Sequence, residues 1–173
     1  RRLLVQGTLL VLLIVAAEGG LRAAGPYRVP GSDSWTENAE RYGRALESKI
    51  ANWKMTCAAL TGASMVGFHK EWEYLADWLG FHMVGYVEDR AGIPPSPQHL
   101  AELAATLETL GTRRILRAPY NDERACRGVA ERAGATVITL PTQVGATPEI
   151  RTYEDLIEAI LDPLCAGIGN LSH

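Results

Sequence analysis

The sequence has 173 residues, a length that suits one domain or one domain with an appendage. With 47% hydrophobic and 21% charged residues, it is too apolar for a disordered chain. Twenty acidic residues against 17 basic ones leave a net charge of −3 with histidine neutral, so nucleic acid is not an expected partner. The motifs GxxxxGK[ST], GxSxG, HExxH and GxGxxG are absent, which disfavours the enzyme classes that depend on them.

The chain opens with a segment that has the features of an export signal. Two arginines precede an apolar core over residues 9–17, and Ala17 and Gly19 are small residues suited to a cleavage site. The core is shorter than the about 20 residues that a transmembrane helix needs. We therefore predict a signal-peptide-like or membrane-proximal segment over residues 1–24 and a periplasmic or extracellular location. The alternative is a buried strand or helix at the start of a domain.

A linker and one long helix are expected next. Residues 25–33 (GPYRVPGSD) are rich in glycine and proline, which is typical of a loop. Ser34 and Glu37 then fit a capping box, and apolar side chains recur every three or four residues up to Leu60. A helix over residues 34–60 would be about 40 Å long. It is either a packing helix or a spine that joins two lobes.

From residue 61 onward, short apolar strands alternate with helices. Strands are expected over residues 63–68, 81–87, 114–117 and 136–140, and helices over residues 69–79, 98–110, 122–133 and 153–164. This alternation predicts an α/β fold: a four-stranded parallel sheet with helices on both faces. Ligands of such sheets bind beyond the carboxyl ends of the strands. The polar residues that follow the four strands are residues 69–70, 88–89, 120–122 and 142–143.

Two side chains at this edge have the chemistry of a site. His69 directly follows the first strand, where a neutral imidazole is a good zinc ligand, although a helix-start or core histidine is the alternative. Glu88 ends the second strand and is either a second functional carboxylate or a solvated loop charge. Asp122 is expected to cap the next helix. His82 and His99 are expected to be structural.

The three cysteines point to no cluster. Cys57, Cys126 and Cys165 are too scattered for a disulfide scaffold or a cysteine-based zinc site. They allow at most one intrachain disulfide, with one thiol left over. Cys126 lies between two arginines that would lower its pKa, but an unreactive helix thiol is the favoured interpretation.

Several segments together resemble the solute-binding proteins of ABC importers of the zinc/manganese class. The helix from residue 38 to 60 is similar to the long helix that joins the two lobes of that family. Further similar segments, in chain order, are MVGFHKEWEYLAD (65–77), VGYVE (84–88), GIPPSP (92–97), APY (118–120), AGA (133–135), LP (140–141) and VG (144–145). The resemblance covers about residues 38–165, and the joint order of the segments is far more specific than any one of them.

This resemblance implies a binding protein rather than an enzyme. It implies two α/β lobes that hold one zinc or manganese ion between them and deliver it to an ABC transporter permease. Residues 61–173 would form the carboxy-terminal lobe, with His69 as its metal ligand. The sequence offers no counterpart of the amino-terminal lobe, so we expect a chain truncated to one lobe. Thr142 or Gln143 stands where the family frequently has Asp, and Ala118 where Glu is familiar.

The expected ligand set is incomplete. Zinc sites need three or four nitrogen, sulfur or oxygen ligands, and one imidazole cannot supply them. We expect weak metal binding unless a second copy or another lobe completes the shell. The alternative function is a small α/β enzyme or ligand-binding domain that uses His69 and Glu88 in acid–base chemistry. A third interpretation is a fragment without function that self-associates through its exposed lobe interface.

Overall fold

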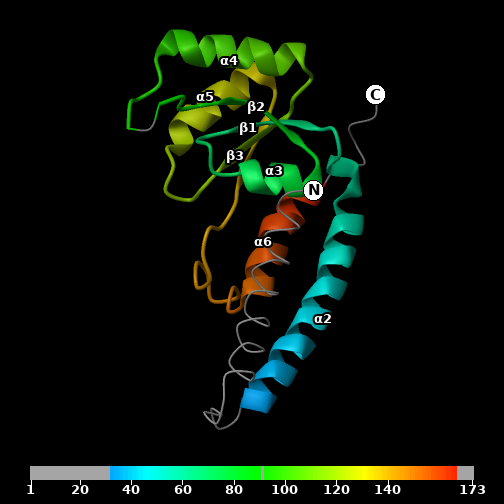
Figure 1. Ribbon diagram of the computed structural model, residues 1–173. Coiled ribbons are helices and arrows are strands. Elements are labelled where there is room, and N and C mark those ends of the chain that lie inside the picture. The colour runs from blue at the N-terminus through cyan, green and yellow to red at the C-terminus, as the bar shows by residue number, and fades with distance from the viewer. Residues whose placement is uncertain (1–31, 91, 167–173) are drawn as a thin grey trace, which may run out of the picture. The chain divides into compact units, whose positions relative to one another are not determined.

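The structure is a computed structural model that describes residues 32–90 and 92–166 (Figure 1). The predicted signal-like segment, residues 1–24, lies outside the described residues, as do residues 25–31 of the predicted linker. Among the helices of the described ranges, none combines the length and the apolar content that crossing a membrane requires.

Helix α2 (Ser32–Thr56) corresponds to the predicted long helix but has different ends. It starts at Ser32 rather than Ser34, and it stops at Thr56 rather than Leu60. A short 3-10 helix, Ala58–Leu60, follows it, because the last turn of a helix often tightens in this way. The chain divides into two compact units at Asn52, within α2, and the elements below all belong to the second unit, Trp53–His173.

Four strands form one sheet in the order β2-β1-β3-β4, and all neighbours pair in parallel, as predicted. The strands are β1 (Ser64–Gly67), β2 (His82–Tyr86), β3 (Arg114–Arg117) and β4 (Thr136–Thr139). Val66 is in register with Ile115, and Arg114 with Thr136. The chain runs from β1 to one side for β2 and then to the other side for β3. The carboxyl ends of β1 and β3 therefore flank the point where strand order reverses, and α/β sheets bind ligands at such points.

Helices cover both faces of the sheet, as predicted (Figure 1). Helices α4 (Pro97–Thr109) and α5 (Glu123–Ala133) lie on one face, and α3 (Glu73–Leu79) and α6 (Tyr153–Cys165) lie on the other. Val66 and Ile115 belong to one buried cluster with Leu107 of α4 and Val129 of α5, and all four are 0% exposed. Each such side chain contributes about 2 kcal/mol when it leaves water. This core fixes the strand ends on which the candidate site stands.

Side-chain caps define where three of these helices begin. Asp122 accepts hydrogen bonds from two amides in the first turn of α5, so the predicted cap is confirmed. Thr152 and Asp155 form a capping box at the start of α6, and the Ser96 hydroxyl caps α4. Each cap is worth about 1 kcal/mol. The starts of these three helices are therefore determined by residues close to them in the sequence.

Helix α3 differs from its prediction at its beginning. It starts at Glu73 instead of residue 69, and residues 69–72 form turns and bends. Phe68 and Trp72, which are 3% and 6% exposed, anchor this connection in the core. As a result, the residues between them stand at the edge of the sheet and not in the first turn of a helix.

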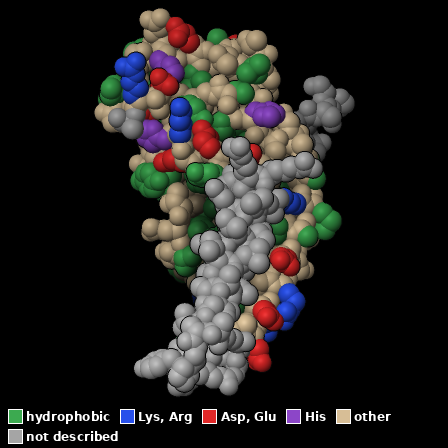
Figure 2. Space-filling model, in the orientation of Figure 1, with side chains coloured by type: hydrophobic (Ala, Val, Ile, Leu, Met, Phe, Trp, Pro, Cys, Tyr) green, Lys and Arg blue, Asp and Glu red, His purple; other side chains and the backbone are tan. Residues whose placement is uncertain are grey.

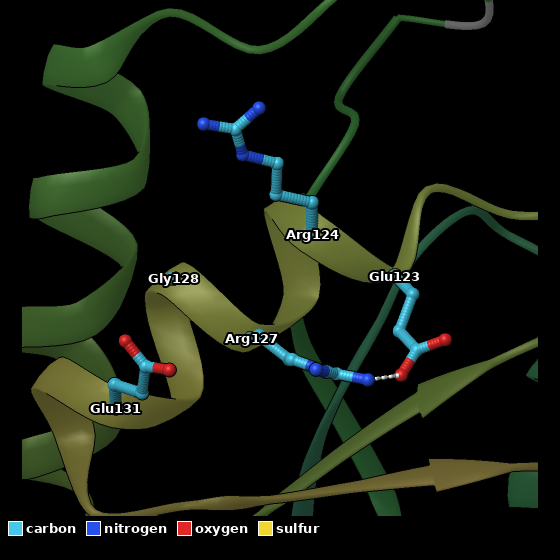
Figure 3. Close-up of a pocket in the computed structure, with 5 residues that line it drawn as sticks. All are labelled: Glu123, Arg124, Arg127, Gly128 and Glu131. Carbon is cyan, nitrogen blue, oxygen red and sulfur yellow. Dashed lines mark hydrogen bonds and ion pairs between the residues drawn. The ribbon is translucent and has the colours of Figure 1, made fainter.

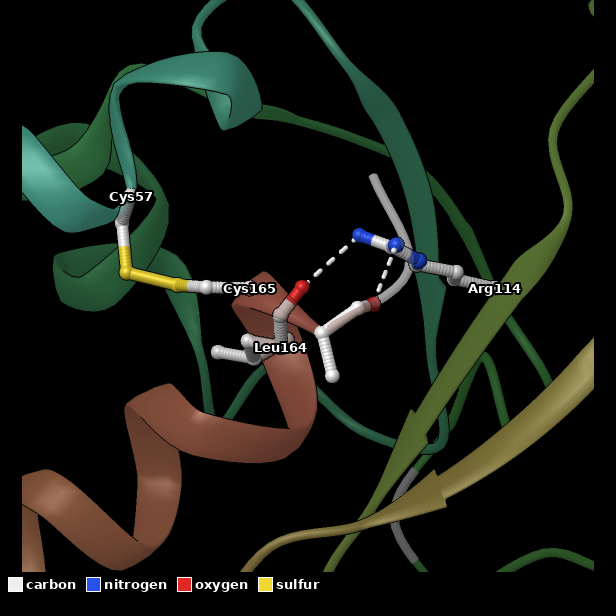
Figure 4. The surroundings of a disulfide bond; sticks show 5 residues. Cys57, Arg114, Leu164 and Cys165 are labelled. Carbon is white, nitrogen blue, oxygen red and sulfur yellow. Dashed lines mark hydrogen bonds between the residues drawn. A yellow bond between two sulfur atoms is a disulfide. The ribbon is translucent and has the colours of Figure 1, made fainter. Parts of the chain in front are cut away.

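A disulfide joins the two ends of the second unit. Cys57, just after α2, is bonded to Cys165, the last residue of α6, with 5.3 Å between the Cα atoms (Figure 4). Beside it, the Arg114 guanidinium of β3 donates hydrogen bonds to the carbonyl oxygens of Leu164 at 2.8 Å and Ala166 at 3.1 Å. The last carbonyls of a helix generally lack intrahelical partners, so Arg114 caps the carboxyl end of α6. The sequence allowed one disulfide and left its partners open.

Candidate metal site

The carboxyl ends of the four strands bring the predicted polar residues, together with Glu71, to one edge of the sheet. His69 and Glu71 follow β1, Glu88 follows β2, Asn121 follows β3 and Thr142 follows β4. Figure 2 shows histidine, basic and acidic side chains close together on one face of the α/β part. We call this edge the strand-end rim.

His69 and Glu88 form a pair across the ends of β1 and β2. The His69 Nε2 atom lies 3.7 Å from Oε1 of Glu88, with side chains 27% and 12% exposed. The ring of buried Phe68 meets the imidazole edge-on, with centroids 4.7 Å apart at 90°. The Gly92 amide donates a 2.5 Å hydrogen bond to Oε1 of Glu88. The imidazole of His69 and the carboxylate of Glu88 are therefore both held in place and partly open to solvent.

Glu71 connects the ends of β1 and β3 and was not singled out from the sequence. Its Oε2 accepts a 2.9 Å hydrogen bond from the Asn121 amide, and its Oε1 accepts a 3.2 Å bond from the Tyr120 hydroxyl. Tyr120 is largely exposed, but partial desolvation of its hydroxyl, and then the charge of Glu71, raise its pKa, while a hydrogen bond with Thr142 opposes the shift. The only available signal was an acidic residue two positions after His69, and the predicted helix from residue 69 concealed it.

Arg117 shapes the loop that carries Tyr120. This side chain at the end of β3 is buried, and its Nη1 donates to the carbonyl oxygens of Ala118, Pro119 and Asn121 at 3.2, 3.4 and 2.8 Å. Its Nη2 lies 3.1 Å from Oε2 of Glu123. A buried charge is tolerated only with such a set of partners. The conformation of the loop after β3 therefore depends on the guanidinium of Arg117.

A second polar group lies beside the rim, at β2. The Tyr86 hydroxyl donates to Glu73, and burial, together with that carboxylate, raises the pKa of Tyr86 to about 12. His99 is engaged through Nε2, which lies 2.9 Å from the Tyr86 carbonyl oxygen. The ammonium group of Lys70 lies 5.6 Å from the centroid of the Tyr86 ring. These contacts give His99 the structural role that the sequence indicated.

The remaining candidates lie away from the rim. His82 begins β2, at the opposite end of the strand from Glu88, and its side chain is exposed. Cys126 is fully buried, and burial raises its pKa to about 12, only partly offset by the charge of Arg117. Its two sequence neighbours therefore do not activate it, and it is an unreactive helix thiol, as favoured from the sequence.

A hollow of about 520 Å³ on α5 does not offer a better site (Figure 3). All the described residues that line it belong to that one helix: Glu123, Arg124, Arg127, Gly128 and Glu131. Arg127 turns toward Glu123 and pairs with it, whereas Arg124 points away. No polar groups converge there on a common point, so the rim remains the candidate site.

The rim by itself holds too few donors for a closed zinc site. Across residues 32–90 and 92–166, no group of three or more His, Cys, Asp or Glu side chains could hold a metal ion. A neutral imidazole and a carboxylate are suitable ligands for zinc or manganese. His69 and Glu88 thus fit such an ion chemically but provide two donors out of the three or four required.

Comparison with known proteins identifies the class. Residues 29–167 match the family model described as zinc-uptake complex component A, periplasmic (ZnuA). This family consists of metal-ion solute-binding components of ABC transport, which are not enzymes. The chain belongs to the ZnuA family, as its sequence motifs indicated. A search of curated proteins found no match.

Solved structures share the fold at low sequence identity. A crystal structure of ZnuA is 19% identical, with a TM-score of 0.66, over 95% of this chain and 59% of that chain. The laminin-binding protein Lbp of Streptococcus pyogenes is 24% identical, with a TM-score of 0.63, over 78% of this chain and 52% of that one. FpvC of Pseudomonas aeruginosa, in complex with Mn²⁺, is 18% identical, with a TM-score of 0.63, over 82% and 54%. This chain therefore spans little more than half the length of these proteins.

Proposed function

We propose that this protein captures a divalent metal ion, zinc or manganese, outside the cytoplasmic membrane and passes it to an ABC transporter permease. The observation that carries the proposal is the partly exposed imidazole of His69 at the strand-end rim, in a chain of the ZnuA family. The rim is where α/β sheets bind ligands. The family and the structural neighbours support a divalent ion and leave the choice between zinc and manganese open.

The disulfide supports a location outside the cytoplasm. Disulfides persist in oxidising compartments such as the periplasm and are rare in the cytosol of mesophiles. The Cys57–Cys165 bond is consistent with the periplasmic setting of the family. The signal-like segment, residues 1–24, supports the same location.

Metal titration by calorimetry tests the binding. We expect zinc or manganese to bind the full chain in the micromolar range or weaker, because the chain supplies few ligands. His69→Ala should abolish this binding. His82→Ala is the matched control, since it removes an exposed imidazole from the opposite end of the strands, and it should leave binding unchanged. Equal titration curves for wild type and His69→Ala would contradict the proposal.

The delivery step requires a separate experiment. Cells of the source organism that lack this protein should take up less of the bound metal from metal-poor medium. Restoring the wild-type chain should recover uptake, and restoring the His69→Ala chain should not. Unchanged uptake in the deletion strain would leave the protein a binder without a role in import.

A further inference from the structure

Strand β4 forms one lateral edge of the sheet, and its hydrogen-bonding groups on that side are open. The amides of Thr136 and Leu140 donate hydrogen bonds toward β3, so every second residue of β4 faces that strand. Backbone groups alternate in direction along a strand, so the N–H and C=O groups of Val137 and Thr139 point away from the sheet. In the part of the chain that the structure describes, no hydrogen bond reaches these groups. Such a row of open groups can pair with a further strand.

The opposite lateral edge, formed by β2, is protected. The pairing of β2 with β1 contains a register shift between Met65 and Val66, and Nε2 of His99 lies 2.9 Å from the carbonyl oxygen of Tyr86. Irregular pairing and covering side chains are means by which proteins block an edge strand. Strand β4, with the sequence TVIT, carries no charged side chain or proline that would serve the same purpose. Of the two lateral edges, that of β4 is therefore the one suited to a partner.

The sequence of β4 is complementary to itself. When two copies pair antiparallel about a twofold axis at Ile138, Val137 of each copy lies opposite Thr139 of the other. Both residues direct their N–H and C=O groups at the interface, so each opposed pair exchanges both of its hydrogen bonds. Ile138 then lies opposite its own counterpart in a non-hydrogen-bonded pair, where side chains come closest. Val137 and Ile138 are only half-buried in one chain, so the pairing removes more of their apolar surface from water.

Helix α5 carries exposed charges above this edge. It packs on β3 and β4 with α4 as its neighbour on the same face of the sheet, so its other side lies toward the open edge. Arg127 and Glu131 are one helical turn apart, and both side chains are exposed. Figure 3 shows them on one side of the helix. A basic and an acidic side chain in this order can match the same two side chains of a helix that runs in the opposite direction.

The twofold axis through Ile138 places these charges opposite each other. From Thr136 to Ile138 the strand advances about 7 Å, as much as about four to five residues of an α-helix. Counted back from the end of α5 at Ala133, this distance leads to Val129. Arg127 and Glu131 lie on either side of that level, so Arg127 of each copy stands opposite Glu131 of the other.

The spacing between the two helices also suits direct packing. A helix above the outer pair of strands lies about 5 Å from the axis, so the two α5 helices lie about 10 Å apart. Packed helices are separated by about 8–10 Å. The hollow of about 520 Å³ along α5 provides room for the side chains of the second helix.

We infer that this protein forms a dimer in which two β4 strands pair edge to edge and two α5 helices pair through Arg127 and Glu131. The partner at this edge is a second copy of the chain, because the strand and the charged side of the helix are each complementary to themselves. An interface about a twofold axis requires this property. The contact lies beside β4 and not at the strand-end rim, so this inference goes beyond metal capture and does not depend on it.

Sedimentation equilibrium of the full chain in chelator tests the dimer. We expect a dimer fraction that rises with protein concentration and requires no metal. Thr139→Lys places a charge in the paired segment, and Arg127→Glu sets two acids against each other, so each should weaken dimerisation about 10-fold or more. His82→Lys is the matched control, because it places the same charge at the exposed start of the opposite edge strand. This control should dimerise like wild type, and so should Thr139→Val, which keeps the branched side chain at the edge.

Two further measurements locate the contact. Adding Glu131→Arg to Arg127→Glu exchanges the two charges and should restore most of the dimerisation that the single variant loses. Amide hydrogen exchange at Val137 and Thr139 should slow as the dimer forms, because these amides then have partners. Circular dichroism of each variant shows that it is folded.

The opposite outcomes overturn the inference and leave the proposed metal capture untouched. A chain that stays monomeric at every concentration has no such dimer. A dimer that persists fully in Thr139→Lys, or that leaves the exchange of Val137 and Thr139 unchanged, uses another surface and overturns the pairing of the strands. Failure of the exchanged charges to restore dimerisation overturns the pairing of the α5 helices.

Discussion

The side-chain amide of Asn121 donates a 2.9 Å hydrogen bond to Oε2 of Glu71, across the point where the strand order of the sheet reverses. This bond joins residues that follow β1 and β3 and lie 50 positions apart in the sequence. It links these two strand ends through side chains of the protein itself. His69 and Glu88 lie on the other side of β1, at the ends of β1 and β2.

The first prediction concerns the ionisation of Tyr120. Partial desolvation and the negative charge of Glu71 raise its pKa, so Glu71→Gln should lower the pKa of Tyr120 toward its ordinary value. A phenolate titration followed by ultraviolet absorption or NMR measures the change. Glu73→Gln is the control, because Glu73 contacts Tyr86 and should shift only that tyrosine. An unchanged Tyr120 titration in Glu71→Gln would show that the contact does not persist in solution.

The second prediction separates two arginines that share one partner. Arg117 and Arg127 both pair with Glu123, but the Arg117 side chain is 9% exposed and that of Arg127 is 66% exposed. Arg117→Met leaves three loop carbonyls without their donor and should cost about 3 kcal/mol of unfolding free energy. Arg127→Met should cost much less, since exposed ion pairs contribute little. Urea unfolding measures both variants, and similar losses would contradict the role given to burial.

The third prediction compares two glycines. A Cβ at Gly85 of β2 would lie 2.7 Å from Cδ1 of Leu103, whereas a Cβ at Gly128 of α5 would meet nothing within 4 Å. Gly85→Ala should destabilise the fold by about 1–3 kcal/mol. Gly128→Ala should stabilise it by about 0.5–1 kcal/mol, because alanine restricts the unfolded chain and suits a helix interior.

A double variant identifies the cause of the Gly85 effect. Adding Leu103→Ala to Gly85→Ala removes the clash, so the combined loss in urea unfolding should be smaller than the sum of the two single losses. Strict additivity would show that the cost of Gly85→Ala arises from something other than the Leu103 contact.

The fourth prediction concerns the disulfide. Cys57 and Cys165 are 108 positions apart, and a cross-link over a loop of that length contributes about 2–5 kcal/mol to stability. Cys57→Ala/Cys165→Ala should unfold at correspondingly lower urea concentration than the oxidised wild type. A reducing agent should lower the stability of the wild type and leave the double variant unchanged. If reduction affects both equally, the bond is not the source of the difference.

The fifth prediction concerns alkaline pH. Burial raises the pKa of Cys126 from 9.0 to about 12, so the folded chain keeps a proton that the unfolded chain loses. The stability associated with this thiol is fully present below pH 9.0 and is lost as the pH rises toward about 12. Cys126→Ala should therefore lose less stability over this range than the wild type does. Unfolding curves at several pH values test this, and parallel declines in both proteins would contradict it.

Local patterns in the sequence were sufficient for most elements of the α/β unit. Strand β3 (Arg114–Arg117) has the predicted bounds, and Asp122 caps α5 as expected. Apolar runs and capping residues act over a few positions, so they can be recognised without the rest of the fold. His69 and Glu88 also lie at the strand-end rim, because the ends of parallel strands necessarily share one edge.

The long-range features could not be predicted in the same way. Three cysteines allow three pairings, and only the folded chain brings Cys57 to Cys165. The contact between Glu71 and Asn121 depends on the start of α3 at Glu73, which the helical pattern placed four residues too early. The buried aromatic side chains around that start override the local preference for helix. The position of Glu71 at the strand-end rim therefore depends on tertiary packing, which local sequence patterns do not reveal.

The bond between Cys57 and Cys165 turns the segment between them into a covalently closed ring that contains all four strands. A protease that cuts any single loop of this ring, such as the one over residues 140–152, opens the chain without releasing a fragment. The nicked protein keeps its mass on a gel run without reductant and separates into two pieces only after reduction. Damage of this kind in an extracytoplasmic setting would leave the sheet and its rim physically joined.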